Sequence, residues 1–387
     1  MQKRFVFLSV FLLVFAVLVL TSIGIVMLTS TGAYAREAKG DPSYFLKRQL
    51  IWLAVGVVCS VVAAVMDYRW MEKRWWILYT FAAVLLVCCF IPGIGKRING
   101  SRRWIGLAGQ TFQPSEMGKL AALVALAWWY ARKETLMKSF RGGFLYPLLG
   151  IGALIALIAP EVDLGTSSLI FATTVMVMFV AGTRLRYLIA MAAMGGAGLG
   201  FVIWKMPERL GRLLAFIYPK EYPADAYQQV QGLIGFGSGG IYGLGLGNGR
   251  QKNSWLPYAH TDFILPSLGE ELGLPATLLV VLLFLLIIVM GTIIATRASD
   301  RFGKLLGFGV VTLIGFQAAL NIGVTTMVLP NKGLPLPFIS YGGSNLAFCL
   351  IGIGILISIY RRGFGERPDP EGYVFAAKVR RRKTPRI

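Results

Sequence analysis

Long apolar runs, separated by shorter polar segments, make up most of this chain. The first covers residues 5–30, and the later runs lie at 49–67, 76–92, 114–130, 144–161, 166–182, 188–204, 274–296, 305–329 and 346–360. A helix needs about twenty apolar residues to cross the hydrocarbon core of a bilayer. The pattern therefore predicts an all-α integral membrane protein, a polytopic bundle of about ten transmembrane helices with a large extracytoplasmic loop at 205–273, between helices 7 and 8.

The first run has features of a signal peptide, with Lys3 and Arg4 before it and an Ala33-Tyr34-Ala35 sequence after it. A signal-peptide core has about 7–15 apolar residues, and this run is longer. We therefore expect an uncleaved first helix that begins in the cytoplasm. An even number of spans then places both termini there, with a membrane domain at 1–361 and a basic cytoplasmic tail at 362–387, whose cluster at 380–383 would bind anionic membrane lipid.

Composition excludes the soluble classes. The chain is 56% hydrophobic and only 15% charged, with mean hydropathy +0.65, whereas soluble domains have about 25% charged residues. The net charge of +21 is spread through short loops, with a bias toward the predicted cytoplasmic side. We therefore expect no nucleic-acid partner.

Basic residues also lie on the predicted outer side, against this orientation signal. They are Lys96, Arg97, Arg102 and Arg103 in one short loop, and Lys332 in another. Binding of an anionic headgroup or a pyrophosphate would explain them. Simple solvation of the loops explains them as well, so both interpretations stay open.

Charged residues within or between the predicted spans form the next group. Glu116 and Lys119 are three residues apart, so a helix places them on one face, where they can form a buried pair. Such a pair fits a functional site or a helix-orienting contact equally well. Pro160, Glu161 and Asp163 interrupt the apolar sequence between two spans, which is typical of a cavity wall at membrane depth.

Two glycine-rich segments lie among the outer loops. Eight glycines fall between residues 235 and 249, followed by Lys252, and glycine permits tight turns and close approach to a ligand. Residues 330–345 are rich in Pro and Gly, which favours a re-entrant turn over a helix. Gly196 and Gly200 in the seventh run form a GxxxG pattern, which indicates helix packing.

Three carboxylates and the only histidine cluster at the end of the longest polar segment. They are His260, Asp262, Glu270 and Glu271, just before the run at 274–296. Half-desolvated acids at a membrane boundary are candidates for chemistry on a lipid-linked substrate. Alternatively, Asp262 is a solvated loop acid, and the two glutamates favour the start of the next helix.

Together, motifs along nearly the whole chain resemble those of the SEDS family (shape, elongation, division and sporulation proteins). They are NGSRRWI at 99–105, FQPSE at 112–116 with Lys119, DLGT at 163–166, the glycine loop at 237–252, HTDFI at 260–264, GEELG at 269–273 and GLPLPFISYGG at 333–343. The histidine before Thr261 and the sequence around Lys332 resemble the FtsW/SpoVE branch more than the RodA branch. Tyr258 departs from the family, which commonly has a glutamate there.

The resemblance implies a peptidoglycan glycosyltransferase that polymerises lipid II at the outer face of the bacterial cytoplasmic membrane. It also implies a class B penicillin-binding protein as transpeptidase partner, along with other division or elongation proteins. The family's essential carboxylate falls on Asp262, the expected general base of an inverting transfer. The outer face offers no ATP, so the donor must carry its own diphosphate leaving group, which cationic side chains would stabilise.

Further residues are expected to bind substrate. These are Lys96, Arg97, Arg102, Arg103, Glu116, Lys119, Asp163, Lys252, His260, Glu270, Lys332 and Ser340. For His260, positioning of the loop is favoured over catalysis, because the reaction needs one base. A divalent cation (Mg or Mn) could assist, although no residue pattern commits to a metal site and no metal ligand is assigned.

Two other functions fit the same sequence. A lipid II flippase would also have charged residues within spans and a Gly/Pro-broken centre, although no inverted repeat is visible. A non-catalytic scaffold could recruit a transpeptidase through its loops and tail. Polymer formation and lipid translocation from one reconstituted sample would separate these functions from the enzyme.

Overall fold

The structure is a computed structural model that describes residues 2–34, 41–98, 101–107, 109–161, 163–253 and 255–365. Asn99 and Gly100 of the NGSRRWI motif, and the predicted lipid-binding cluster at 380–383, lie outside the described residues. So does most of the predicted tail.

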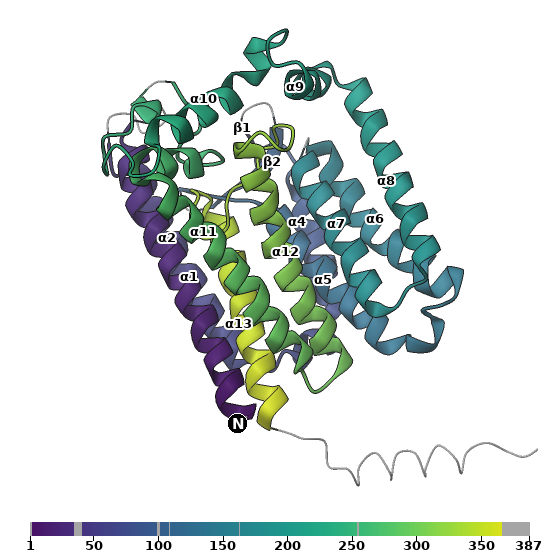
Figure 1. Ribbon diagram of the computed structural model, residues 1–387. Coiled ribbons are helices and arrows are strands. Elements are labelled where there is room, and N and C mark those ends of the chain that lie inside the picture. Colours follow the sequence, from purple (N-terminus) through teal and green to yellow (C-terminus); the bar gives the residue numbers. More distant parts are fainter. Residues whose placement is uncertain are drawn as a thin grey trace, which may run out of the picture.

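A bundle of long helices forms the body of the protein (Figure 1), and each predicted apolar run overlaps one of them. The helices are α1 (Gln2–Gly32), α2 (Tyr44–Val65), α4 (Trp75–Cys88), α5 (Pro114–Arg132), α6 (Tyr146–Ile158), α7 (Leu164–Ala181), α8 (Leu185–Lys205), α11 (Ile264–Thr296), α12 (Arg301–Thr325) and α13 (Gly343–Gly365). Among the described residues, 8 helical segments are long and apolar enough to cross a membrane. The chain is therefore a polytopic membrane protein, as predicted. The two bundle helices outside this set are α4, which is short, and α5, which contains the buried charged residues Glu116 and Lys119.

Local sequence explains where several helices begin and end. Asp163 caps α7 by accepting a hydrogen bond from the backbone N–H of Thr166, and Asp300 caps α12 in the same way. Pro114 lies in the first turn of α5, where its missing N–H costs nothing. The left-handed φ of 92° at Gly182 ends α7.

Helices distant in sequence pack side by side in the bundle. α2 lies against α13, α1 against α11, and α12 against α5, α7 and α11. One apolar core of buried Leu, Ile, Val, Ala, Met and Phe side chains runs through these contacts. At the bundle end near the N-terminus, shorter segments connect the helices: α3 (Arg69–Lys73), η2 (Glu134–Leu136) and the π-helical η3 (Arg141–Leu145).

The opposite end of the bundle, which we call the site end, carries most of the shorter elements (Figure 1). A three-stranded antiparallel sheet there consists of β1 (Gly95–Ile98), β2 (Ser101–Leu107) and β3 (Gln110–Phe112), in the order β1-β2-β3. The expectation of an all-α chain therefore holds for the bundle, while the basic loop that was predicted on the outer side is a small sheet. The remaining short elements are η4 (Ala159–Glu161), α9 (Pro207–Ile217), α10 (Pro223–Gly239) and η5 (Gln251–Asn253).

The segment 205–273, expected to be an aperiodic loop, is largely helical. It contains α9, α10, η5 and the first turns of α11. Gly273 interrupts α11 with a φ of 73°, and Pro275 follows, so a short half-helix precedes the long one. A side chain at Gly273 would collide with the backbone of Ile241, 2.3 Å from its carbonyl oxygen.

The expected packing at Gly196 and Gly200 is not found within the described part of the chain. A Cβ added at either glycine would have no atom within 4 Å. Because α8 contacts mainly its sequence neighbours α7 and α9, this stretch of the helix has no partner helix to pack against.

Candidate active site

Asp262 lies in a tight turn at the site end, directly before α11. Backbone groups of this turn are held from two sides. The side-chain amide of Asn321 on α12 donates to the Asp262 carbonyl at 2.8 Å, and the Ser340 hydroxyl donates to the Thr261 carbonyl at 2.6 Å. Tyr258 enters the turn with a φ of 56°, a conformation that costs free energy in a non-glycine residue. The surroundings therefore fix the position of the aspartate.

The segment 330–342 forms one wall beside Asp262. Residues 330–342 have no helix, as predicted, whereas residues 343–345 of the predicted non-helical segment already lie in α13, which begins at Gly343. Gly333 lies so close to the carboxylate that a Cβ there would be 2.8 Å from Asp262 Oδ2. Asn321 and Gln317 on α12 donate to the carbonyls of Leu334 and Pro335, so α12 holds both the turn and this wall.

Asp163 and Arg103 lie on another side of the site. Asp163, only 4% exposed, accepts hydrogen bonds from the Thr166 backbone N–H, the Thr166 hydroxyl and the Gln113 amide at 2.9–3.0 Å. Arg103 Nη1 lies 3.5 Å from Asp163 Oδ2. The pair joins β2 to the start of α7, which brings the sheet over the same end of the bundle.

The pKa of Asp262 is raised from its ordinary value of 3.8 to about 6. Burial is the main cause, because it disfavours the charged form. The positive charge of Arg103 opposes the rise, the negative charge of Asp163 adds to it, and Arg212 opposes it. A carboxylate with a pKa near 6 can accept a proton at neutral pH more readily than an ordinary aspartate.

Lys332 lies in the same wall as Gly333. Its ammonium is 3.3 Å from the Ser168 hydroxyl on α7. Burial lowers the pKa of Lys332, and the positive charge of Arg209 lowers it further. Lys332 thus lies against the first turns of α7, within range of the charge of Arg209.

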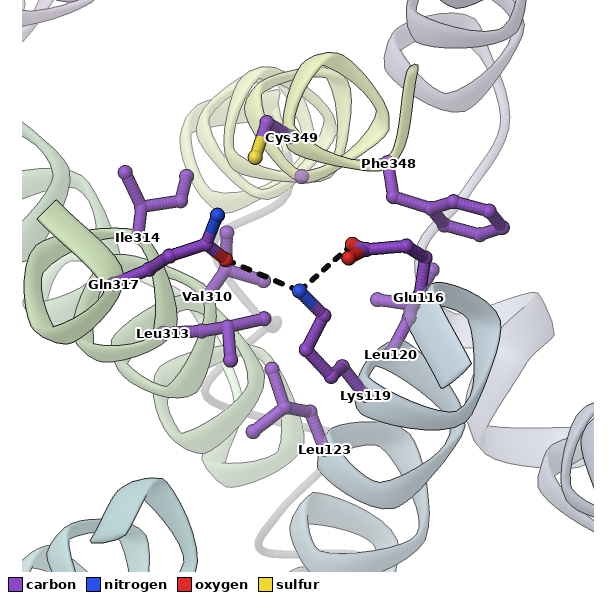
Figure 2. A pocket seen from close by; sticks show the side chains of 11 residues that line it. Glu116, Lys119, Leu120, Leu123, Val310, Leu313, Ile314, Gln317, Phe348 and Cys349 are labelled. Atoms are coloured by element: carbon purple, nitrogen blue, oxygen red, sulfur yellow. Dashed lines mark hydrogen bonds and ion pairs between the residues drawn. The ribbon is translucent and has the colours of Figure 1, made fainter. Parts of the chain in front are cut away.

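Glu116 and Lys119 form the predicted pair, 2.7 Å apart and 4% and 3% exposed on their side chains. Figure 2 shows Lys119 pointing from α5 toward α12, between Glu116 and Gln317, whose side-chain oxygen is 3.1 Å away. The adjoining cavity is about 20 Å³, which is room for a water molecule rather than a sugar. Because Gln317 also binds the Pro335 carbonyl, the pair supports the wall beside Asp262 from within the bundle.

Glu270 holds the end of the glycine-rich segment. Its carboxylate accepts from the backbone N–H groups of Arg250 at 2.9 Å and Gln251 at 3.1 Å, and it is 1% exposed. Gly239 packs so closely that a Cβ there would lie 2.1 Å from the Gly269 carbonyl oxygen. These contacts give Glu270 an observed role in fixing the loop; its predicted contact with substrate stays a prediction.

Lys252 is buried in an ion pair with Glu271, 2.7 Å apart with side chains 1% and 0% exposed. The same ammonium donates to the Ser30 hydroxyl on α1 and to the Gly247 carbonyl. Glu271 in turn accepts from the Gly247 backbone N–H at 2.8 Å. We call Ser30, Gly247, Lys252 and Glu271 the clasp; in this arrangement Lys252 faces the clasp rather than Asp262.

His260 is 6% exposed and packs on Phe45 of α2, with ring centroids 4.2 Å apart and the rings tilted by 37°. Its carbonyl accepts from the backbone N–H of Tyr341 at 3.0 Å. The ring thus lies in an aromatic cluster next to the turn, an arrangement that suits the expected role in positioning the loop.

The remaining predicted cations lie on the sheet. Lys96, Arg97 and Arg102 are exposed. Arg97 on β1 lies opposite Arg102 on β2 in the register of the sheet. Arg103, in contrast, is partly buried at 28% exposure and reaches Asp163. The four cations of this predicted loop therefore separate into one that reaches Asp163 and three that are exposed on the sheet.

Arg209 and Arg212 of α9 are further cations at the site end that the sequence analysis did not identify. Their charges act on Asp163 and Asp262, respectively. The signal was present: Pro207 begins the segment, and the arginines are three apart while Leu210, Leu214 and Ile217 recur on another face. Reading 205–273 as one aperiodic loop concealed this helix.

No group of three or more His, Cys, Asp or Glu side chains with metal-binding geometry occurs in the part of the chain that the structure describes. The divalent cation considered above thus stays a prediction.

Comparison with known proteins decides which family has this arrangement. A family model for FtsW, RodA and SpoVE, described as cell cycle protein, matches residues 11–363. A probable peptidoglycan glycosyltransferase FtsW of Geobacter metallireducens is 41% identical over 346 residues, covering 89% of this chain and 92% of the relative. The chain belongs to the FtsW/RodA/SpoVE family.

Other members of the FtsW/RodA/SpoVE family agree in length and fold. Stage V sporulation protein E of Bacillus subtilis is 38% identical over 354 residues, covering 90% of this chain and 96% of the relative. A chain from a solved peptidoglycan synthase complex, described as coordinating polymerization and crosslinking, matches with a TM-score of 0.76 at 26% identity, covering 92% of this chain and 98% of that one. The rod shape determining protein RodA of Thermus thermophilus matches with a TM-score of 0.67 at 25% identity, covering 92% and 97%.

Proposed function

We propose that this member of the FtsW/RodA/SpoVE family is a peptidoglycan glycosyltransferase that polymerises lipid II into glycan strands at the outer face of the bacterial cytoplasmic membrane. The observation that carries the proposal is Asp262: a fixed carboxylate with a pKa of about 6, on which the charge of Arg103 acts, at the end of the bundle that also holds Lys332. Relatives named as peptidoglycan glycosyltransferases support the assignment.

In the proposed reaction, Asp262 is the general base. It takes the proton from the 4-hydroxyl of the acceptor sugar while that oxygen bonds to the anomeric carbon of the donor. The bond from the anomeric carbon to the diphosphate breaks at the same time, and the diphosphate leaves with the electron pair. Attack from the face opposite the leaving group inverts the anomeric carbon.

The leaving group explains why one carboxylate is enough. A diphosphate needs positive charge rather than a proton; Arg103, whose charge acts on Asp262, and Lys332, at the same end of the bundle, would supply it. Inverting glycoside hydrolases differ, because a second carboxyl group protonates their leaving oxygen. After transfer, the proton on Asp262 passes to water, which restores the base.

The proposed setting is the cytoplasmic membrane, with both termini in the cytoplasm and the site end outside. The predicted partner is a class B penicillin-binding protein, which would crosslink the strands. The structural match to a chain of a peptidoglycan synthase complex supports a partner of that kind.

Reconstitution of the purified chain with lipid II tests the function. Polymer and lipid translocation are measured in the same vesicles, with and without a chelator. Polymer formed by the parent chain supports the enzyme, translocation without polymer supports a flippase, and neither activity supports a scaffold. Polymer yield unchanged by chelation would exclude the divalent cation.

A further inference from the structure

The part of α11 nearest the site is a half-helix at residues 264–272, and Asp262 lies two residues before it. Gly273, with φ 73° and ψ −170°, separates the half-helix from the long part of α11, so the two parts do not form one rigid rod. Contacts with other elements therefore set the orientation of the half-helix. Because only Phe263 lies between Asp262 and the half-helix, this orientation also sets the position of the carboxylate.

α10 packs closely along one side of the half-helix. A Cβ at Gly232 would lie 3.2 Å from the ring of Phe263, and a Cβ at Gly239 would lie 2.1 Å from the Gly269 carbonyl oxygen. Glycine permits this approach because it has no side chain. This packing fixes the side of the half-helix that faces α10, and the end beside α1 is held by other contacts.

The clasp holds that end. The Ser30 hydroxyl on α1 donates to the Glu271 carboxylate, with 2.7 and 2.8 Å to its two oxygens. The Lys252 ammonium lies 2.7 Å from the same carboxylate and donates to Ser30 at 2.6 Å. The backbone N–H of Gly245 donates to the Glu271 carbonyl at 3.0 Å. A membrane-spanning helix is thus joined directly to the end of the half-helix.

Apolar packing between α1 and α11 is incomplete next to the clasp. A groove of about 430 Å³ lies there, lined by Leu272 at the end of the half-helix and by α1 residues that include Val26, one turn before Ser30. The buried ion pair and hydrogen bonds of the clasp, in contrast, require one geometry, because a partner that moved away would leave a buried charge unpaired. The clasp therefore carries the connection between α1 and this end of the half-helix.

We propose that Ser30 is a positioning residue: through Glu271 it fixes the half-helix, and it thereby holds the carboxylate of Asp262 where the acceptor hydroxyl binds. This inference rests on the proposed function and adds to it a residue of α1. A catalytic group displaced by about 1 Å can lose about 10²-fold in rate. Removal of the Ser30 hydroxyl leaves the ion pair of Lys252 and Glu271 in place, so its effect is smaller.

Polymerisation of lipid II by the full chain, at equal amounts of folded protein, measures the effect. We expect Ser30→Ala to lower kcat about tenfold. The KM for lipid II should stay the same, and so should the pH at which kcat/KM reaches half of its plateau, because the charges that act on Asp262 are unchanged. Ser30→Thr keeps a hydroxyl at this position and should restore most of kcat.

A double variant separates positioning of Asp262 from a general structural role. In the Asp262→Asn background the base is absent, so Ser30→Ala should leave the residual rate unchanged. A general loosening of the site end would lower the rate by the same factor in both backgrounds.

Thr31→Ala is the matched control. Thr31 is the next residue on α1 and is 1% exposed, but its hydroxyl donates to the Met27 carbonyl of its own helix at 2.8 Å. This variant loses a buried hydroxyl without touching the half-helix, so its kcat should equal that of the parent.

A parent-like kcat for folded Ser30→Ala overturns the proposal, as does an equal loss with and without the Asp262 carboxylate. A loss for Thr31→Ala as large as that for Ser30→Ala also overturns it. The proposed function is tested separately: it fails if the single Asp262→Asn variant polymerises lipid II as well as the parent, whatever the result for Ser30→Ala.

Discussion

Arg103 on β2 and Asp163 at the start of α7 form an ion pair, with 3.5 Å between Nη1 and Oδ2. Their charges act on the pKa of Asp262 in opposite directions: Arg103 lowers it, and Asp163 raises it. The two members of this ion pair therefore shift the pKa of the proposed base in opposite directions.

The pH dependence of polymerisation tests this tuning. For the parent, kcat/KM should rise with pH through about 6 and then level off, because the base must be deprotonated. Arg103→Gln removes a charge that lowers the pKa of Asp262. The rise of kcat/KM with pH, which we call the acid limb, should therefore move to higher pH in this variant. Asp163→Asn removes a charge that raises this pKa, so its limb should move to lower pH.

Arg102→Gln is the control for both shifts. Arg102 is an exposed neighbour on the same strand and is not among the charges that act on Asp262. Its acid limb should match that of the parent. If the acid limbs of Arg103→Gln and Asp163→Asn moved in the same direction, the charges of these two residues would not set the pKa of Asp262 in opposite ways.

Asp262 should lower the thermal stability of the fold at neutral pH. Its pKa is raised on folding from 3.8 to about 6, so the folded state binds the proton more tightly than the unfolded state. Its contribution to the free energy of unfolding therefore falls as pH rises from about 4 to 6, and stays low above that. Asp262→Asn removes the titration, so its Tm should exceed that of the parent at pH 7 and approach it at pH 4.

Differential scanning fluorimetry in detergent measures this difference. Asp225→Asn, an exposed aspartate on α10, should show no such pH-dependent gain. A Tm difference for Asp262→Asn that grows toward pH 4 would have the wrong sign for a buried carboxylate with a raised pKa.

The Glu116–Lys119 pair should behave as one unit. Lys119→Met leaves a buried carboxylate without its cation, and Glu116→Gln leaves a buried ammonium without its anion. Loss of one partner of a buried pair costs about 3–5 kcal/mol of stability. The double variant should be more stable than the Lys119→Met variant. Thermal unfolding of the parent, the two single variants and the double variant measures the coupling free energy. Losses of stability that add up in the double variant would show that the pair is not coupled.

Glu270 and Glu271 should protect different amides of the glycine-rich segment. Glu271 accepts from the Gly247 backbone N–H, whereas Glu270 accepts from those of Arg250 and Gln251. Glu271→Gln should therefore speed hydrogen exchange first at Gly247, and Glu270→Gln first at Arg250 and Gln251. Each variant is the control for the other, and identical exchange patterns would contradict this division.

Features that depend on nearby residues could be predicted from the sequence. The apolar runs predicted the helices of the bundle, and the three-residue spacing of Glu116 and Lys119 predicted their ion pair. The Pro/Gly content of 330–345 predicted a non-helical segment, because these residues disfavour continuous helix.

Features that depend on tertiary contacts could not be predicted in this way. Nothing local to Lys252 shows that its ammonium binds Ser30 on α1 instead of facing the site. Likewise, the pKa of Asp262 depends on charges from β2, the start of α7 and α9, which only the fold brings together. For α9, the local pattern was present but short, and it was interpreted together with the rest of the polar segment 205–273 as a loop.

The most direct test of the central claim is polymer synthesis from purified lipid II by Asp262→Asn, compared with the parent and with Asp225→Asn at equal amounts of folded protein. General-base catalysis contributes about 10²–10⁴-fold to rate. The account predicts a loss of that size for Asp262→Asn and a parent-like rate for Asp225→Asn. A parent-like rate for Asp262→Asn would contradict the assignment of Asp262 as the base.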